Sequence, residues 1–176
     1  LVTKMNNTNA GQVSYDFRLD APGRLVPYVH GAGGTDQASS TRVMRDDIWH
    51  HVTFIWSAAA GVKLYIDGVL DASAPWTGSG AMLSSWPVWI GRARYGGDSQ
   101  FYYFKGDLDD IKLYNYARAA SRIAADADAD SDGLPDGVEQ QIVDHNPGDA
   151  IDDINDVLPG DDFDKDGRNN GEEYAD

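Results

Sequence analysis

The chain contains no cysteine and no long apolar run, and both absences narrow what it can be. Without cysteine, neither disulfide bonds nor thiolate metal sites can hold the fold together. No stretch is apolar for long enough to predict a membrane span, and we identify no signal peptide. With 176 residues, 41% of them hydrophobic, the chain can still bury a core and form one or two domains.

The net charge of -15 is concentrated in the last third of the chain. Residues 1–120 carry 11 Lys or Arg against 11 Asp, whereas residues 121–176 carry 3 Lys or Arg against 18 Asp or Glu. This step in charge predicts a domain boundary near residue 120, with one domain over residues 1–120 and a second over residues 121–176. A chain this acidic is not expected to bind nucleic acid.

Two twelve-residue loops in the acidic segment have the spacing that a calcium ion requires. Residues 128–139 and 162–173 each place oxygen-bearing side chains at positions 1, 3, 5, 9 and 12, and glycine at position 6. In such loops short carboxylates bind from alternate positions, position 7 contributes a backbone carbonyl, and Glu at position 12 binds with both oxygens. We therefore predict two Ca²⁺ sites. The predicted ligands are Asp128, Asp130, Asp132, Leu134, Asp136 and Glu139 in the first loop, and Asp162, Asp164, Asp166, Arg168, Asn170 and Glu173 in the second, with Leu134 and Arg168 contributing carbonyls.

Three alternatives to this assignment arise from the same residues. An acidic run can be a solvated, disordered tail, but regular spacing argues against that interpretation. A register beginning at Asp126 would place Ser131 at position 6 and lose the glycine. Pro135 stands at position 8, where a β-branched residue usually pairs two EF-hand loops, so a paired calcium sensor is not expected. We expect structural sites, with affinities on the order of 10⁻⁴–10⁻³ M, that order a segment too poor in apolar residues to fold alone.

The first 120 residues predict β structure. Asp67-Gly68 between two apolar runs predicts a tight hairpin, because both turn residues need positive φ. Turns rich in Gly, Pro, Asn and Ser separate the other runs, which predicts an antiparallel sandwich. The predicted strands are Gln12–Leu19, Arg24–His30, Trp49–Trp56, Val62–Ile66, Val69–Leu70, Pro87–Gly91 and Phe101–Tyr114, and short helices are predicted at Ala117–Ala127 and Val138–Val143.

Four motifs in this part occur in an order that resembles a known family. They are residues 49–53 (Trp-His-His-Val-Thr), 62–68 (Val-Lys-Leu-Tyr-Ile-Asp-Gly), 89–92 (Trp-Ile-Gly-Arg) and the acidic and aromatic run 104–118. The series resembles the laminin-G-like branch of the concanavalin A-like lectin/glucanase superfamily. The resemblance implies a mainly β fold, a jelly-roll sandwich of antiparallel sheets followed here by a small C-terminal α/loop calcium-binding segment. It also implies sugar binding or adhesion within larger secreted proteins.

Both ends of the chain carry further expectations from resemblance. Members of that family begin with one or two strands upstream of the segment that Leu1–Lys4 resembles, so we expect the sandwich to be N-terminally incomplete and completed by other chains or domains. Leu1 in place of Met agrees with a mature product or a piece of a larger protein. Residues 121–176 resemble thrombospondin type 3 and dockerin-like calcium-binding repeats, which often follow laminin-G-like domains in bacterial surface proteins.

Candidate catalytic residues are few. Asp107, Asp109 and Asp110 lie in a predicted strand where alternation would place Asp107 and Asp109 on one face, as in glycosidases of the superfamily that this chain resembles. Residues 1–120 contain no Glu, however, and no other catalytic motif occurs. His50 and His51 would point to opposite faces of a strand, so they are expected to pack in the sheet rather than to share a metal.

A sugar site needs an exposed aromatic face with polar groups beside it. The loops around Trp76 and around Tyr95 and Asp98 are the best candidates, whereas Trp49, Trp56 and Trp89 fall in strand patterns and are expected in the core. We predict a secreted or cell-surface, non-catalytic binding or adhesion module, bacterial in origin, for a glycan or another extracellular surface ligand. The alternatives are a glycoside hydrolase or polysaccharide lyase, and a structural, assembly or dockerin-like docking subunit.

Overall fold

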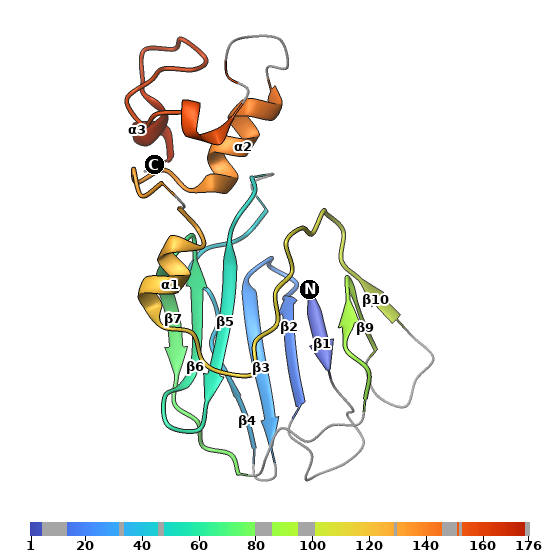
Figure 1. The fold of residues 1–176 in the computed structure, drawn as a ribbon. Helices are drawn as coiled ribbons and strands as arrows, with labels where there is room; N and C mark the ends of the chain where they lie inside the picture. The colour runs from blue at the N-terminus through green and yellow to red at the C-terminus, as the bar shows by residue number, and fades with distance from the viewer. Residues whose placement is uncertain are drawn as a thin grey trace. The chain divides into compact units, whose positions relative to one another are not determined.

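The computed structural model describes residues 1–4, 14–31, 34–45, 48–79, 86–94, 101–128, 130–145, 151 and 153–174, and it divides into two compact units (Figure 1). The first unit comprises Leu1–Arg45, Phe54–Leu64 and Leu70–Ala117. The second comprises Asp46–Thr53, Tyr65–Val69 and Arg118–Asp176. The prediction of a single boundary at residue 120 does not assign Asp46–Thr53 and Tyr65–Val69 to the second unit, to which they belong in the structure.

The described elements are mostly short strands, followed by short helices. The strands are β1 (Val2–Lys4), β2 (Ser14–Leu19), β3 (Leu25–Gly31), β4 (Gly34–Gln37), β5 (Val52–Ser57), β6 (Gly61–Ile66), β7 (Val69–Ala74), β8 (Trp89–Ile90), β9 (Arg92–Arg94) and β10 (Phe101–Tyr103). The helices are α1 (Ala120–Ala125), α2 (Asp136–His145), the 3₁₀ turn η1 (Ile154–Asp156) and α3 (Asn170–Tyr174).

The strands form antiparallel sheets, as the sequence predicts. One sheet has the order β4-β3-β2-β1-β8, with Val2 opposite Phe17 and Tyr15 opposite Val29. A second sheet has the order β5-β6-β7, and β9 pairs with β10. The predicted hairpin between β6 and β7 is confirmed, since Asp67 (φ 48°) and Gly68 (φ 76°) both have the left-handed backbone of a two-residue hairpin turn.

The core of the first unit lies between β-strands of the two larger sheets. Val29 of β3 and Val62 of β6 are fully buried, and Phe54, Trp56 and Trp76 are among the partly buried side chains that pack against them. Such packing of two inner faces defines a β-sandwich, so the predicted mainly β fold is confirmed.

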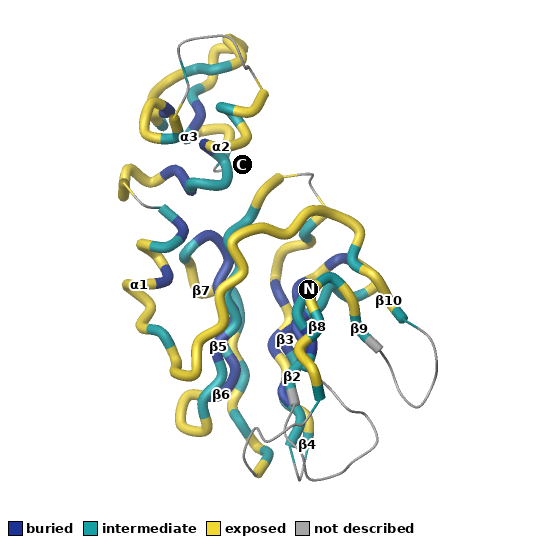
Figure 2. The backbone as a smooth tube through the Cα atoms, turned by 45° about the vertical axis from the view of Figure 1, so that its right-hand side comes forward, coloured by how far each residue is buried: buried dark blue, intermediate teal, exposed yellow. Residues whose placement is uncertain are grey.

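Three strand predictions extend too far, and Pro87–Gly91 is a strand only over Trp89–Ile90. The run Phe101–Tyr114 is a strand only as far as Tyr103, because Gly106 (φ 150°) and Asp110 (φ 44°) interrupt an extended conformation. Residues 107–116 are exposed throughout, and Figure 2 shows this stretch in yellow. The predicted strand Trp49–Trp56 begins only at Val52, as β5. Just before it, the His50 side chain and the His51 backbone N–H bind Asp67 of the hairpin turn instead of continuing the strand.

The second unit has its own small core. Ile123 and Leu134 are fully buried, and Ala127 and Val157 are 1% exposed. Both predicted helices are present with shifted bounds, and α2 begins two residues earlier than predicted because acidic residues in its first turn favour a helix N-terminus. Among the described residues, no helix is both long enough and apolar enough to cross a membrane.

Candidate metal and ligand sites

The two acidic loops share a left-handed backbone at two matching positions. The fourth residue, Ser131 or Lys165, has φ 62° in both loops, and the sixth, Gly133 or Gly167, has φ 99°. Residues other than glycine rarely adopt left-handed conformations. An acidic composition alone would therefore not place such conformations at the same positions of both loops. The structure therefore contains an internal repeat at the two places where the sequence predicts metal sites.

Hydrogen bonds repeat in the same way and hold the carboxylates of the loops. The N–H of Gly133 donates to Asp128 Oδ2 at 3.2 Å, and the N–H of Gly167 donates to Asp162 Oδ2 at 2.9 Å. The residue at position 7 donates its N–H to the carboxylate at position 5 in each loop, at 2.8 Å in the first and 2.9 Å in the second. One oxygen of each of these carboxylates is thus held by the backbone.

Carboxylate oxygens from alternate residues lie close together in each loop. One carboxylate oxygen from each of Asp128, Asp130 and Asp132 lies within 4.8 Å of the others, and Asp162, Asp164 and Asp166 form the same arrangement. Repulsion between like charges opposes such a cluster unless a cation offsets it.

Three buried oxygens at these clusters lack a hydrogen bond in the described part of the chain: Asp128 Oδ1, Glu139 Oε1 and Asp162 Oδ1. A buried carboxylate oxygen without a donor costs free energy, and hard cations such as Ca²⁺ bind oxygens of this kind. The donor set, all carboxylates with a buried Glu at position 12 of the first loop, fits calcium.

Glu139 is the most unusual of these groups. Its side chain is 1% exposed, and it lies in the first turn of α2 beside the carboxylates of its own loop. Burial, followed by the charges of Asp130, Asp132, Asp136 and Asp128, raises the pKa of Glu139 to about 8. In the metal-free loop this carboxyl group therefore holds a proton near neutral pH.

The second loop differs from the first at positions 9 and 12. Asn170 is 3% exposed, and its side chain accepts a hydrogen bond from the N–H of Phe163 and donates one to the carbonyl of Leu158. The side-chain oxygen of this predicted ligand is therefore engaged within the loop, and its nitrogen is engaged with Leu158 before the loop. Glu173 is exposed, although burial and the neighbouring aspartates also raise its pKa. Glu173, at position 12 of the second loop, is thus less enclosed by the protein than Glu139 at position 12 of the first.

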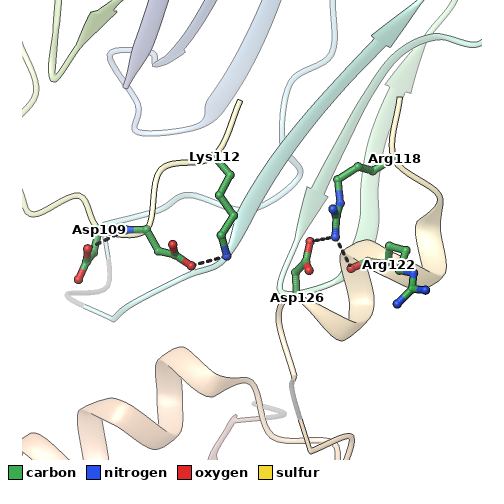
Figure 3. A network of polar contacts seen from close by, with 6 residues as sticks. Asp109, Lys112, Arg118, Arg122 and Asp126 are labelled. Atoms are coloured by element: carbon green, nitrogen blue, oxygen red, sulfur yellow. Dashed lines mark hydrogen bonds and ion pairs between the residues drawn. The ribbon is translucent and has the colours of Figure 1, made fainter. Parts of the chain in front are cut away.

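The alternative register that begins at Asp126 does not fit the structure. Asp126 ends α1 and pairs with Arg118, which also donates to the carbonyl of Arg122 at 3.4 Å (Figure 3). The carboxylate of Asp126 thus braces the short helix before the loop.

A buried polar cluster joins the hairpin turn to the end of the chain within the second unit. Asp67 Oδ2 lies 2.8 Å from His50 Nδ1 and 3.3 Å from the hydroxyl of Tyr174, and Asp67 Oδ1 accepts the N–H of His51 at 3.0 Å. A carboxylate only accepts hydrogen bonds, so His50 donates from Nδ1. His50 and the backbone of His51 thus brace the hairpin turn, whereas the expectation that the two histidines lie in a strand is wrong, since β5 begins at Val52.

A hollow of about 270 Å³ also lies within the second unit, lined by Trp49, Gln141, Asp144 and His145. The expectation that Trp49 belongs to the core is wrong, since this residue is 40% exposed. Trp49 precedes β5 rather than lying within it, so it does not share the alternation of that strand. No sequence signal connects Trp49 with α2, because the two are far apart along the chain.

The predicted ligand residues of the first unit lie in different surroundings. Trp76 is partly buried and meets Trp56 edge to face at 5.4 Å, and its ring fills the space that a Cβ on Gly31 or Gly78 would need. Its packing contacts account for much of its surface, and a ligand-binding role for it stays a prediction. Tyr95 and Asp98 lie outside the described residues.

The candidate catalytic aspartates do not lie in a strand. Asp107, Asp109 and Asp110 are exposed, so the alternation that would place Asp107 and Asp109 on one face is absent. Asp109 accepts the N–H of Asp110 at 2.7 Å, and Asp110 pairs with Lys112 at 2.6 Å (Figure 3). These contacts organise a local turn.

Comparison with known proteins identifies the β-rich part. Residues 1–124 match the sequence profile of the concanavalin A-like lectin/glucanases superfamily, in its Laminin_G_3 group. Curated proteins include no significant match to the chain. A crystal structure of an S-layer domain-containing protein from Clostridium thermocellum is similar at 18% identity and a TM-score of 0.41, over 70% of this chain and 59% of that one. The chain thus spans less than two thirds of that solved structure.

Proposed function

The chain belongs to the concanavalin A-like lectin/glucanase superfamily, and on this premise we propose that it is a non-catalytic, carbohydrate-binding module with two structural calcium sites. The single observation that carries the calcium part is the group of buried, unpartnered oxygens at the two repeated acidic loops: Asp128 Oδ1, Glu139 Oε1 and Asp162 Oδ1. The superfamily, whose description includes lectins, supports the carbohydrate part.

The residues of each loop have defined parts in this proposal. Asp128, Asp130, Asp132 and Glu139 hold the first ion, and the corresponding Asp162, Asp164, Asp166 and Glu173 hold the second. The ion supplies positive charge that offsets the repulsion within each cluster. Because Glu139 belongs to α2, binding in the first loop also fixes the start of that helix.

A surface or extracellular location follows from the same residues as part of the proposal. Loops of this kind in extracellular modules bind calcium at about 10⁻⁴–10⁻³ M, a range that suits a calcium-rich medium outside the cell. The resemblance of the acidic segment to thrombospondin type 3 and dockerin-like repeats, which lies beyond the family match over residues 1–124, stays a prediction within this proposal.

An enzymatic role has weaker support than binding. The carboxylate pair of a retaining glycosidase is held at about 5–5.5 Å by rigid elements, whereas Asp107, Asp109 and Asp110 are exposed in an irregular segment. A polysaccharide-cleaving activity that disappears in both Asp107→Asn and Asp109→Asn would contradict the non-catalytic proposal.

Calorimetric titration with CaCl₂, accompanied by melting curves, tests the calcium part. We expect saturable binding to two sites, a rise in melting temperature with calcium concentration, and much weaker binding of Mg²⁺, which prefers a tighter octahedral shell. An absence of both heat and thermal stabilisation would overturn the assignment. A glycan array probed with calcium-loaded protein tests the carbohydrate part independently.

A further inference from the structure

We propose that the hollow between Trp49 and α2 is a subsite for one pyranose ring of a glycan, and that its affinity depends on bound calcium. The proposal rests on the carbohydrate and calcium functions proposed above. It adds the location of the sugar, the groups that contact it and the reason why the ions matter to it.

The wall of the hollow is one face of α2. Gln141, Asp144 and His145 follow Gly137 by four, seven and eight residues, the spacing that places side chains on the same side of a helix. Gly137 lies directly against the backbone of Trp49, where a Cβ would come within 3.2 Å of Trp49 Cβ and of its carbonyl oxygen. The close approach at Gly137 holds Trp49 beside the three polar side chains.

The chemistry of this lining suits a sugar better than an apolar ligand. Trp49 is 40% exposed, and an indole offers a flat surface to the C–H face of a pyranose. Asp144 accepts hydrogen bonds from hydroxyl groups, and the amide of Gln141 both donates and accepts. An apolar ligand would leave these groups unpaired. The hollow of about 270 Å³ is smaller than the pockets of about 300–1,000 Å³ that take drug-sized ligands, so we assign it one ring rather than an oligosaccharide.

The polar groups are partly oriented before a ligand arrives. Gln140 Nε2 donates to Asp144 Oδ1 at 2.9 Å, so one carboxylate oxygen is held and the other stays available for a hydroxyl. Prior orientation of this kind lowers the entropic cost of binding.

Both acidic loops hold the helix that carries this wall. The first loop ends inside α2, because Asp136 and Glu139 belong to the first turn of the helix. The second loop contacts its other end, where Phe163 meets His145 edge to face at 6.3 Å. Since a metal-free acidic loop is loosely ordered, loss of calcium would release both ends of the wall. Calcium would therefore strengthen sugar binding without touching the sugar.

The test follows amide and indole resonances of the whole chain by NMR during titration with the methyl glycosides of glucose, galactose, mannose and N-acetylglucosamine. We expect at least one glycoside to shift the Trp49 indole and Gln141 side-chain signals in the presence of calcium, and none to do so with EDTA. Trp49→Ala and Asp144→Asn should each weaken binding about tenfold or more. Tyr103→Ala, which removes an aromatic residue that is 67% exposed in the first unit, is the matched control and should leave binding unchanged.

Calcium calorimetry on the same samples separates the two proposals. Two outcomes would overturn the subsite alone. In one, the protein binds calcium but no glycoside. In the other, the resonance shifts caused by a glycoside map away from Trp49 and persist in Trp49→Ala and Asp144→Asn. Binding of choline in place of every glycoside would also overturn it, since a cation can occupy an indole face beside a carboxylate. If Trp49→Ala unfolds, Asp144→Asn and Gln141→Ala decide the outcome, because both residues are exposed on the helix surface.

Discussion

His50 Nδ1 lies 2.8 Å from Asp67 Oδ2, and the two side chains are 6% and 2% exposed. This contact links the segment before β5 to the hairpin turn between β6 and β7. The hydroxyl of Tyr174, at the end of α3, reaches the same carboxylate oxygen at 3.3 Å. A single aspartate therefore connects three segments of the second unit, and the helix that follows the second acidic loop is among them.

We expect substitution of Asp67 to destabilise the second unit strongly. Leaving the buried partners of Asp67 without an acceptor costs about 1–3 kcal/mol, and Asp67→Ala also places alanine at a left-handed φ of 48°. Asp67→Asn, which tolerates that backbone, should cost less because it keeps one of the two acceptor oxygens. Urea unfolding in saturating calcium measures both, and Asp109→Asn, exposed and remote in sequence, is the control. A loss below about 0.5 kcal/mol for Asp67→Ala, the range of ordinary surface substitutions, would contradict the role assigned to this residue.

The two calcium sites should differ in affinity, with the first loop the tighter. Glu139 is buried at the first cluster, whereas Glu173 is exposed and Asn170 is engaged in internal hydrogen bonds. Calorimetry should show that Glu139→Gln weakens the tighter site and Glu173→Gln the weaker one, and that Asp128→Ala removes one of two ions. Asp156→Asn, an exposed aspartate outside both loops, should change neither. Equal effects of the two Glu→Gln changes would contradict this ranking.

Calcium binding to the first loop should become stronger as pH rises toward 8. The pKa of Glu139 is about 8 in the metal-free loop, against 4.5 for an ordinary glutamate, so calcium must displace a proton at neutral pH. Between these two pKa values the folded metal-free state binds more protons than the unfolded state, so its stability falls as pH rises. Calorimetry in two buffers with different ionisation enthalpies should count about one proton released near pH 7.

Glu139→Gln provides the control for this linkage. Glutamine keeps the volume of the side chain but has no proton to release, so proton release at the first site should disappear. Release that persists in this variant would assign the proton to another group.

The parts that the sequence predicts well are those encoded by local spacing. The turn at Asp67-Gly68 and the two acidic loops follow from short motifs whose backbone requirements are strict, and the structure has the left-handed residues that such motifs need. The end of β10 is harder to predict, because apolar residues recur among the polar ones over residues 104–114 as they do in many strands. Whether such a run becomes a strand depends on a partner in space, which local pattern does not encode.

The hollow beside Trp49 depends on a contact between distant parts of the chain, and no local pattern indicates it. The motif at residues 49–53 places Trp49 in a strand, where alternation predicts burial. Its exposure follows instead from its place before β5, outside the alternation of that strand. Gly137 of α2 lies against the Trp49 backbone. Glycine in a helix weakens helix propensity, so Gly137 is the one local sign that another segment approaches closely there.

Gly137→Ala should therefore destabilise the second unit even though alanine is the better helix former. The gain in propensity is about 1 kcal/mol, whereas forcing a methyl group into a close contact costs about 1–3 kcal/mol. Both nearest atoms, Trp49 Cβ and Trp49 O, lie 3.2 Å from the new methyl position, and the backbone oxygen cannot rotate away. We expect a net loss of about 1 kcal/mol in urea unfolding and a changed fluorescence of Trp49. Gly160→Ala, where no atom lies within 4 Å, is the matched control and should be close to neutral. A stabilised Gly137→Ala protein with unchanged fluorescence would mean that α2 does not lie against Trp49.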